Sequence, residues 1–312
     1  YATVDRMQTT FSNSAGGTIT TSRDTTAPTG FGQSMKFNVT GADTSVGSTH
    51  IVYTEHTLEA QVIRNSGWNY TSSSSYLTLS FQIRSSKTGT YCVFFQTNDG
   101  SAKMYTVEYT ISSADTWEQK VITVPGNSNL TFNNDSGKGL IVAWVWAVGT
   151  DRDGTAETWT DLAYGTSNQV NFLDSTDNIA YITGVQLEVG QYTSSTLPAF
   201  QHESFGDNLK RCQRYFQESQ TWSGGVVNSS SGYVNVTFFE IMRGTPSAST
   251  TGALNANDID GNRDQSSAQI TLHNANTHGI MCQIGNFSSM TTNNPFFSRF
   301  QNNNKITLNA EL

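Results

Sequence analysis

Short runs of alternating apolar and polar residues, separated by clusters of Gly, Ser, Asn and Asp, recur along most of this chain. Side chains of a β-strand point alternately to its two faces, so a period of two residues predicts a strand with one buried face. The turn-forming residues between runs predict tight connections. Before residue 196 the runs are 34–39, 50–62, 76–83, 91–96, 104–111, 118–124, 140–148 and 181–189. So many short strands favour an all-β jelly roll.

The pattern divides the chain into three parts. Residues 1–196 are predicted to form a jelly-roll β-sandwich, and residues 197–220 a connector with one short helix at 204–217. In that helix Leu209, Cys212 and Phe216 make an apolar stripe. Alternation resumes from Gly232 onward, so residues 221–312 are predicted to form a smaller C-terminal β-sandwich domain. Its core is thin for a free-standing unit, which favours oligomerisation.

The charge balance and the lengths of the apolar runs argue against two classes of partner. Only 13% of the 312 residues are charged and the formal net charge is −8, whereas a protein that binds a phosphate backbone carries clustered Lys and Arg. No apolar run approaches the roughly 18 residues needed to cross a bilayer. We therefore expect neither a nucleic-acid partner nor membrane insertion.

The three cysteines, Cys92, Cys212 and Cys282, are odd in number and widely spaced, with no Cys-x-x-Cys pair. This usage argues against a disulfide framework or a structural zinc site and favours free thiols. Free thiols fit assembly in a reducing cytoplasm.

Several motifs occur in a characteristic order. Residues 182–190 read Ile-Thr-Gly-Val-Gln-Leu-Glu-Val-Gly, Phe200-Gln201-His202 follows, and the predicted helix carries Cys-Gln-Arg-Tyr-Phe at 212–216. The chain ends Asn-Ala-Glu-Leu. This series resembles a signature of tail-fibre and other structural proteins of bacteriophages, marine ones especially, in which the first domain looks like the jelly roll of carbohydrate-binding modules.

The resemblance implies a virion protein of the tail-fibre or receptor-binding type, assembled as a homotrimer in the host cytoplasm and exposed on the particle surface. Its partners would be other virion proteins and a host surface glycan. It supplies no catalytic residue, so we expect no enzymatic activity. An architectural virion protein without receptor binding, such as a capsid decoration or tail adaptor, and an envelope polysaccharide depolymerase remain alternatives.

Six aromatic residues are candidates for stacking on sugar rings. Trp144 and Trp146 share one face of the run 140–148, where they would form a platform if that face is open. The alternative is a central strand buried on both faces, which the apolar residues between them favour. Trp68, Tyr70, Trp159 and Tyr164 lie in polar, turn-rich stretches, where they are either exposed for binding or close loops over the core.

Two acidic loops have the alternating oxygen side chains that bind calcium. One is residues 151–157, and the other carries Asp258, Asp260, Asn262 and Asp264. Neither completes an EF-hand, and plain Asp/Gly turns are the favoured alternative. The sequence predicts no other cofactor.

Catalytic signatures are missing from the sequence. The five His residues show no metal-ligand spacing, and no Gly-x-Ser-x-Gly elbow, phosphate loop or dinucleotide fingerprint is present. A glycosidase carboxylate pair is spatial and has no sequence signature, so the sequence leaves it open.

Overall fold

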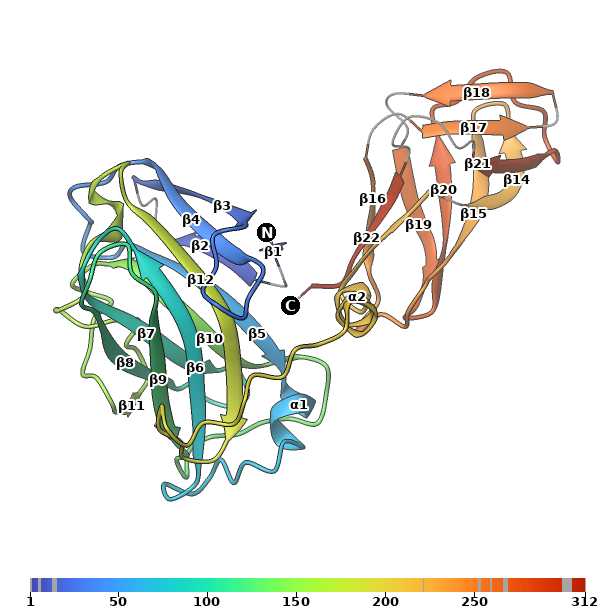
Figure 1. The fold of residues 1–312 in the computed structure, drawn as a ribbon. Coiled ribbons are helices and arrows are strands. Elements are labelled where there is room, and N and C mark those ends of the chain that lie inside the picture. The colour runs from blue at the N-terminus through green and yellow to red at the C-terminus, as the bar shows by residue number, and fades with distance from the viewer. Residues whose placement is uncertain are drawn as a thin grey trace. The chain divides into compact units, whose positions relative to one another are not determined.

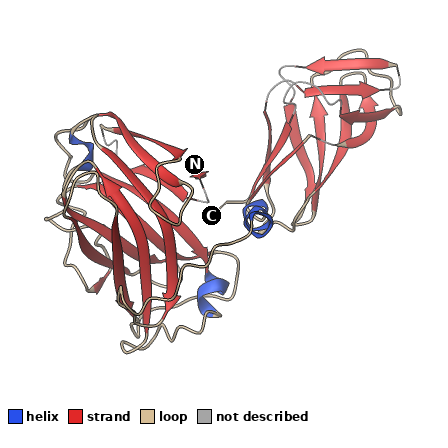
Figure 2. Cartoon of the chain, viewed as in Figure 1, coloured by secondary structure: helices blue, strands red, loops and turns tan. Residues whose placement is uncertain are grey.

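A computed structural model describes residues 2–4, 7–12, 16–220, 222–251, 254–258, 260–265, 269–298 and 305–311. Backbone contacts divide the chain into two compact units, residues 1–201 and 202–312. Each unit is built of antiparallel strands with few helices, as Figure 2 shows. The prediction of an all-β chain with two β-domains is confirmed. No helix in the described ranges is long and apolar enough to span a membrane.

The first unit is a sandwich of two sheets (Figure 1). The larger sheet, to which we give the name front sheet, has the order β1 (Ala2–Val4), β2 (Met7–Ser12), β5 (Ile51–Glu59), β10 (Lys138–Val148), β7 (Gly89–Thr97), β8 (Met104–Ile111) and β11 (Trp159–Thr160). The name does not refer to the viewpoint of Figure 1. The back sheet has the order β3 (Thr18–Asp24), β4 (Ser34–Gly41), β12 (Ile179–Val189), β6 (Tyr76–Ser85) and β9 (Glu118–Pro125). The helix α1 (Ala60–Arg64) and the 3-10 helix η1 (Phe172–Asp174) lie in connections. The run predicted as one strand over 50–62 therefore ends at Glu59, where α1 begins.

Strand β10 is buried on both faces. Its even-numbered residues 140–146 join the core between the two sheets, and its odd-numbered residues 141–145 join a second apolar cluster on the outer side of the front sheet. A strand covered on both sides needs an uninterrupted apolar sequence, which this run supplies. Trp144 and Trp146 are both 0% exposed.

The burial of these two indoles corrects the prediction of a sugar platform. The Trp146 ring lies 4.6 Å from that of Phe37, and the Trp144 ring 5.5 Å from that of Phe81, both across the sandwich. Trp146 Nε1 also donates a hydrogen bond of 2.9 Å to the Thr54 hydroxyl. No ring face is left for a ligand, so the alternative of two core residues holds.

The second unit contains a three-stranded and a seven-stranded sheet. The small sheet has the order β13 (Phe216–Ser219), β22 (Lys305–Asn309) and β16 (Ser247–Thr251). The large sheet has the order β18 (Gly261–Gln265), β17 (Leu254–Asp258), β21 (Pro295–Ser298), β14 (Ser223–Asn228), β15 (Ser231–Thr237), β20 (Gly279–Gly285) and β19 (Gln269–Ala275). Their shared core includes Trp222, Val234, Cys282, Ile306 and Leu308.

The helix α2 (Phe205–Gln213) opens the second unit and is shorter than predicted. Ser204 caps its start by accepting a hydrogen bond from the backbone N–H of Asp207. The expected continuation to residue 217 is wrong, because Phe216–Ser219 pairs with Ile306–Asn309 as β13. The distant partner strand is what ends the helix.

The two core indoles are expected to respond differently to substitution. Trp144→Ala and Trp146→Ala should each reduce the free energy of unfolding by about 3 to 5 kcal/mol. Trp146→Phe should cost about 1 kcal/mol more than Trp144→Phe, because only the Trp146 indole N–H has a partner among the described residues. Urea unfolding of the four variants measures this, and an unchanged midpoint for Trp144→Ala would contradict the core assignment.

Candidate functional site

The outer side of the front sheet presents a row of side chains drawn from several strands. Cross-strand pairing places Gln8 beside Glu55, Glu55 beside Ala143, Ala143 beside Phe94, and Phe94 beside Thr106. Paired residues of neighbouring strands point to the same face. Strands β2, β5, β10, β7 and β8 thus contribute side chains to this side of the sheet, which we call the outer face; Ala143, Phe94 and Thr106 are fully buried there.

Three aromatic rings pack together on the outer face. The Tyr53 and Phe94 ring centroids are 5.2 Å apart, those of Phe94 and Tyr164 are 5.2 Å apart, and those of Tyr53 and Tyr164 are 6.1 Å apart. Phe94 is fully buried beneath the two tyrosines, which remain partly exposed. Burial, together with the negative charge of Glu55, raises the pKa of Tyr53 to about 12. Its hydroxyl is therefore neutral over the physiological range and serves as both donor and acceptor.

The segment that carries Tyr164 is held firmly against the sheet. Gln169 accepts a hydrogen bond of 2.6 Å from the backbone N–H of Cys92 and donates one of 3.2 Å to the carbonyl of Val145. The carboxylate of Glu108 accepts hydrogen bonds from the Thr166 hydroxyl and from the Asn168 amide. These contacts fix the residues after Tyr164 onto β7, β8 and β10.

Glu55 is the unusual polar group of the outer face. It is 6% exposed, and its carboxylate has no hydrogen-bond partner among the described residues. Burial raises the pKa of Glu55, and the positive charge of Lys138 offsets this only in part. A buried carboxylate without partners costs stability, so its presence points to a function rather than to folding. In its ionised form this carboxylate can accept hydrogen bonds.

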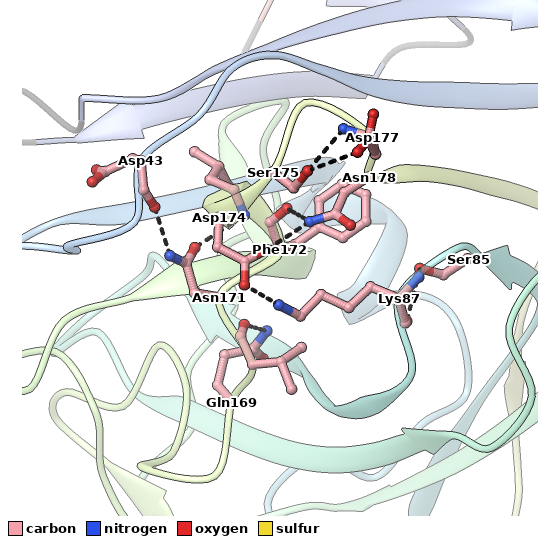
Figure 3. Close-up of polar contacts among 12 residues, drawn as sticks. Asp43, Ser85, Lys87, Gln169, Asn171, Phe172, Asp174, Ser175, Asp177 and Asn178 are labelled. Carbon is pink, nitrogen blue, oxygen red and sulfur yellow. Dashed lines mark hydrogen bonds and ion pairs between the residues drawn. The ribbon is translucent and has the colours of Figure 1, made fainter.

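A second polar cluster, around η1, has the opposite character (Figure 3). Asn171 accepts a hydrogen bond from the N–H of Leu173 and donates one of 2.6 Å to the carbonyl of Asp43. Asn178 donates to the carboxylate of Asp174, which also pairs with the Lys87 ammonium. Each of these groups has its partner within the unit, and they clamp η1 between strand ends. The arrangement is structural.

The remaining aromatic candidates close loops over the core. Trp68 is 3% exposed and donates from Nε1 to the carbonyl of Ser75, and Tyr70 packs against Phe132 at 5.0 Å. Trp159 donates to the carbonyl of Pro125 and packs against the main core. Trp68 is thereby corrected from a binding candidate to a core residue. Tyr164 is the predicted aromatic residue that the structure brings onto the outer face.

The predictions missed Tyr53, Phe94 and Glu55. The alternation in β5 was the available signal, because it puts Tyr53 and Glu55 on the same face of a strand. Phe94 lies on β7 and reaches them only across β10. That proximity depends on sheet order, which the sequence pattern does not state.

The two acidic loops that were candidates for calcium have contacts within the protein. Asp258 and Gly261 pair at the end of the β17–β18 hairpin, and Asp260 accepts a hydrogen bond of 2.8 Å from Asn294. The side chains of Asp258, Asn262 and Asp264 lie outside those that the structure describes. In the 151–157 loop, Asp151 accepts a hydrogen bond from Ser48. Over the described side chains, no three His, Cys, Asp or Glu residues gather in a group that would hold a metal ion.

Comparisons with known proteins find similarity at the level of structure. No family model and no curated protein matches the chain. The enzymatically active domain of tailspike protein 4 of bacteriophage CBA120 is 10% identical, with a TM-score of 0.34, over 60% of this chain and 20% of that one. A family 11 carbohydrate-binding module of a Clostridium thermocellum cellulase is 11% identical, with a TM-score of 0.34, over 61% and 91%. Discoidin II of Dictyostelium discoideum is 10% identical, with a TM-score of 0.18, over 94% and 97%.

The Glu55→Gln variant is expected to melt at a higher temperature than the unmodified protein at neutral pH. The pKa of Glu55 in the folded protein is raised above 4.5, so stability is lost as the pH rises through that folded-state value. Below about pH 4 the carboxyl is protonated in both folded and unfolded states, and the difference should vanish. Calorimetry across this pH range measures the effect.

Glu118→Gln is the matched control. Burial opposes ionisation of Glu118, but hydrogen bonds from Lys120 and from the N–H groups of Ser113 and Ser112 outweigh it and lower its pKa. This variant should melt lower at neutral pH, and the loss should shrink as the pH falls through the folded-state pKa. A Glu55→Gln variant that behaves like Glu118→Gln would show that the Glu55 carboxylate has a stabilising partner.

Proposed function

We propose that the first unit binds a glycan on the outer face. The observation that carries this proposal is the nearly buried carboxylate of Glu55, which has no hydrogen-bond partner among the described residues and lies on the same face as the ring cluster of Tyr53, Phe94 and Tyr164. A sugar ring has apolar C–H faces that pack on aromatic rings, and hydroxyls that donate to carboxylates. Aromatic surface and a fixed acceptor are therefore what such a ligand requires.

We further propose that the chain is a bacteriophage structural protein of the tail-fibre or receptor-binding type. The motifs at 182–190 and 212–216 support this role. In this proposal the protein is exposed on the virion, is assembled in the host cytoplasm with other virion proteins, and attaches to the host through the glycan. Binding without hydrolysis is its proposed activity.

The second unit supports the proposal of a homotrimer. Helix α2 buries none of its residues, and Phe205 and Leu209 are 83% and 42% exposed. Phe216, just after the helix, is 39% exposed. Apolar side chains exposed together favour self-association.

Glycan binding should be lost when the outer face is altered. Tyr164→Ala removes a stacking surface and should weaken binding by about 1 to 3 kcal/mol, and Glu55→Gln should weaken it by removing the charged acceptor. A glycan array finds the ligand, and calorimetric titration of each variant gives its affinity.

Trp117→Ala is the control for this experiment. Trp117 packs against Tyr181 at 6.3 Å and belongs to the back sheet's outer side. Its removal should leave affinity unchanged. Binding that survives both outer-face variants would place the site elsewhere, and release of shortened oligosaccharides would instead show a depolymerase.

Self-association should depend on the α2 surface. The unmodified chain is expected to run as a trimer in light scattering at micromolar concentration. Phe205→Ser with Leu209→Ser should shift it toward monomer without changing its melting temperature in dilute solution, because neither side chain is buried within the chain. A monodisperse monomer of the unmodified chain would contradict the proposal.

A further inference from the structure

The second unit has a hollow of about 330 Å³ at the end of the β19–β20 hairpin. Its polar lining consists of Asn235 and Thr237 of β15, Asn274 of β19, and Asn276 and His278 of the turn that follows. Met281 of β20 lies among them. Its volume is at the lower end for small-molecule sites.

The strand register aims two amides at one spot. Met281 pairs with Asn235 on one side and with Asn274 on the other, and all three are exposed. The alternate residues Val234, Val236, Ile280 and Cys282 face the core. Met281, 37% exposed, is therefore an apolar floor flanked by two Asn side chains.

A β-bulge produces this alignment. The β19–β20 register shifts between Leu272 and Asn274, so His273 is an extra residue opposite no partner. Without the shift His273 would stand beside Met281, and Asn274 would face the other way. Bulges re-aim side chains in this manner and are frequent beside functional sites.

Several hydrogen bonds hold the turn at the rim of the hollow. Asn276 Oδ1 accepts hydrogen bonds from the N–H groups of His278 and Gly279, at 2.8 and 3.1 Å. The His278 Nδ1 atom lies 3.0 Å from the Thr277 hydroxyl. The carbonyl of Thr277 accepts a hydrogen bond of 2.9 Å from the N–H of Met242. These contacts leave the Asn276 amide N–H₂ and the His278 Nε2 atom to face a ligand.

We infer that this hollow is a second binding site and that it takes a neutral polyhydroxylated ligand of one or two sugar rings. An Asn amide offers two donors and an acceptor, which match the hydroxyl pairs of a sugar. None of the described residues that line the hollow is Lys, Arg, Asp or Glu. Met281 supplies the apolar contact for a ring face. The inference rests on the second unit alone and is independent of the function proposed for the first.

The test uses the full chain and the methyl glycosides of glucose, galactose, mannose and N-acetylglucosamine. Saturation-transfer NMR identifies the binder, and a titration of chemical shifts gives its Kd, which we expect to be on the order of 1 mM for a single ring. Asn235→Ala and Asn274→Ala should each weaken binding about threefold to tenfold, the effect of losing a hydrogen bond. Thr271→Ala is the control, because Thr271 is exposed on β19 but does not line the hollow.

Glu55→Gln separates this site from the outer face of the first unit, and binding in the second unit should be unaffected by it. The three substituted side chains of the second unit, Asn235, Thr271 and Asn274, are exposed, and a circular dichroism spectrum that matches the unmodified protein confirms that each Asn variant folds. The inference would be overturned if none of the four glycosides binds, if both Asn variants bind as tightly as the unmodified chain, or if glucuronate binds more tightly than glucose.

Discussion

The first unit depends on the burial of β10 on both faces. Trp144 and Trp146 fill the space between the sheets, while Ala143 and Val145 form the base of the outer cluster. The small Ala143 leaves room for Phe94, and the Phe94 ring in turn packs against the rings of Tyr53 and Tyr164. One strand thus takes part in two apolar layers, so the side chains of the outer face pack on a strand that is fixed in the main core. A ligand surface built in this way loses little entropy on binding, because its side chains are already ordered.

Carboxylates elsewhere in the first unit show what is different about Glu55. Asp174 pairs with Lys87 and Asn178, and Glu118 pairs with Lys120 and two backbone N–H groups. In both groups the ionised form is satisfied within the fold. Glu55 is more deeply buried than either, and among the described residues only the positive charge of Lys138 favours its ionised form. Folding alone would favour a neutral residue at this position, and this is why we propose a binding role for Glu55 on the outer face.

The sequence predicted the strands well because alternation is a local property. It also offered two interpretations of β10, a sugar platform and a strand buried on both faces, and the apolar residues at 141, 143 and 145 favoured the buried strand. It missed the outer-face site because Glu55 and Phe94 meet only through β10, and strand order is a long-range property. The predicted end of α2 was wrong for a related reason. Residues 214–217 continue a helical stripe, but the backbone of Phe216 pairs with Asn309, far along the chain. Local propensity yields to such tertiary pairing.

The two proposed sites use different chemistry for related ligands. The outer face combines aromatic rings with one charged acceptor, which suits a ligand with a broad apolar face and donor hydroxyls. The hollow of the second unit combines neutral amides with a methionine floor, which suits a smaller ligand held by paired hydrogen bonds. Each hydrogen bond to a sugar contributes little net binding free energy, because it replaces a hydrogen bond between the sugar and water. A chain that presents two such sites gains from effective concentration once one of them is filled, and a trimer of chains would gain again. Several weak sites also permit release, which a single tight site would prevent, and the proposed role in attachment to a host would make use of such reversible binding.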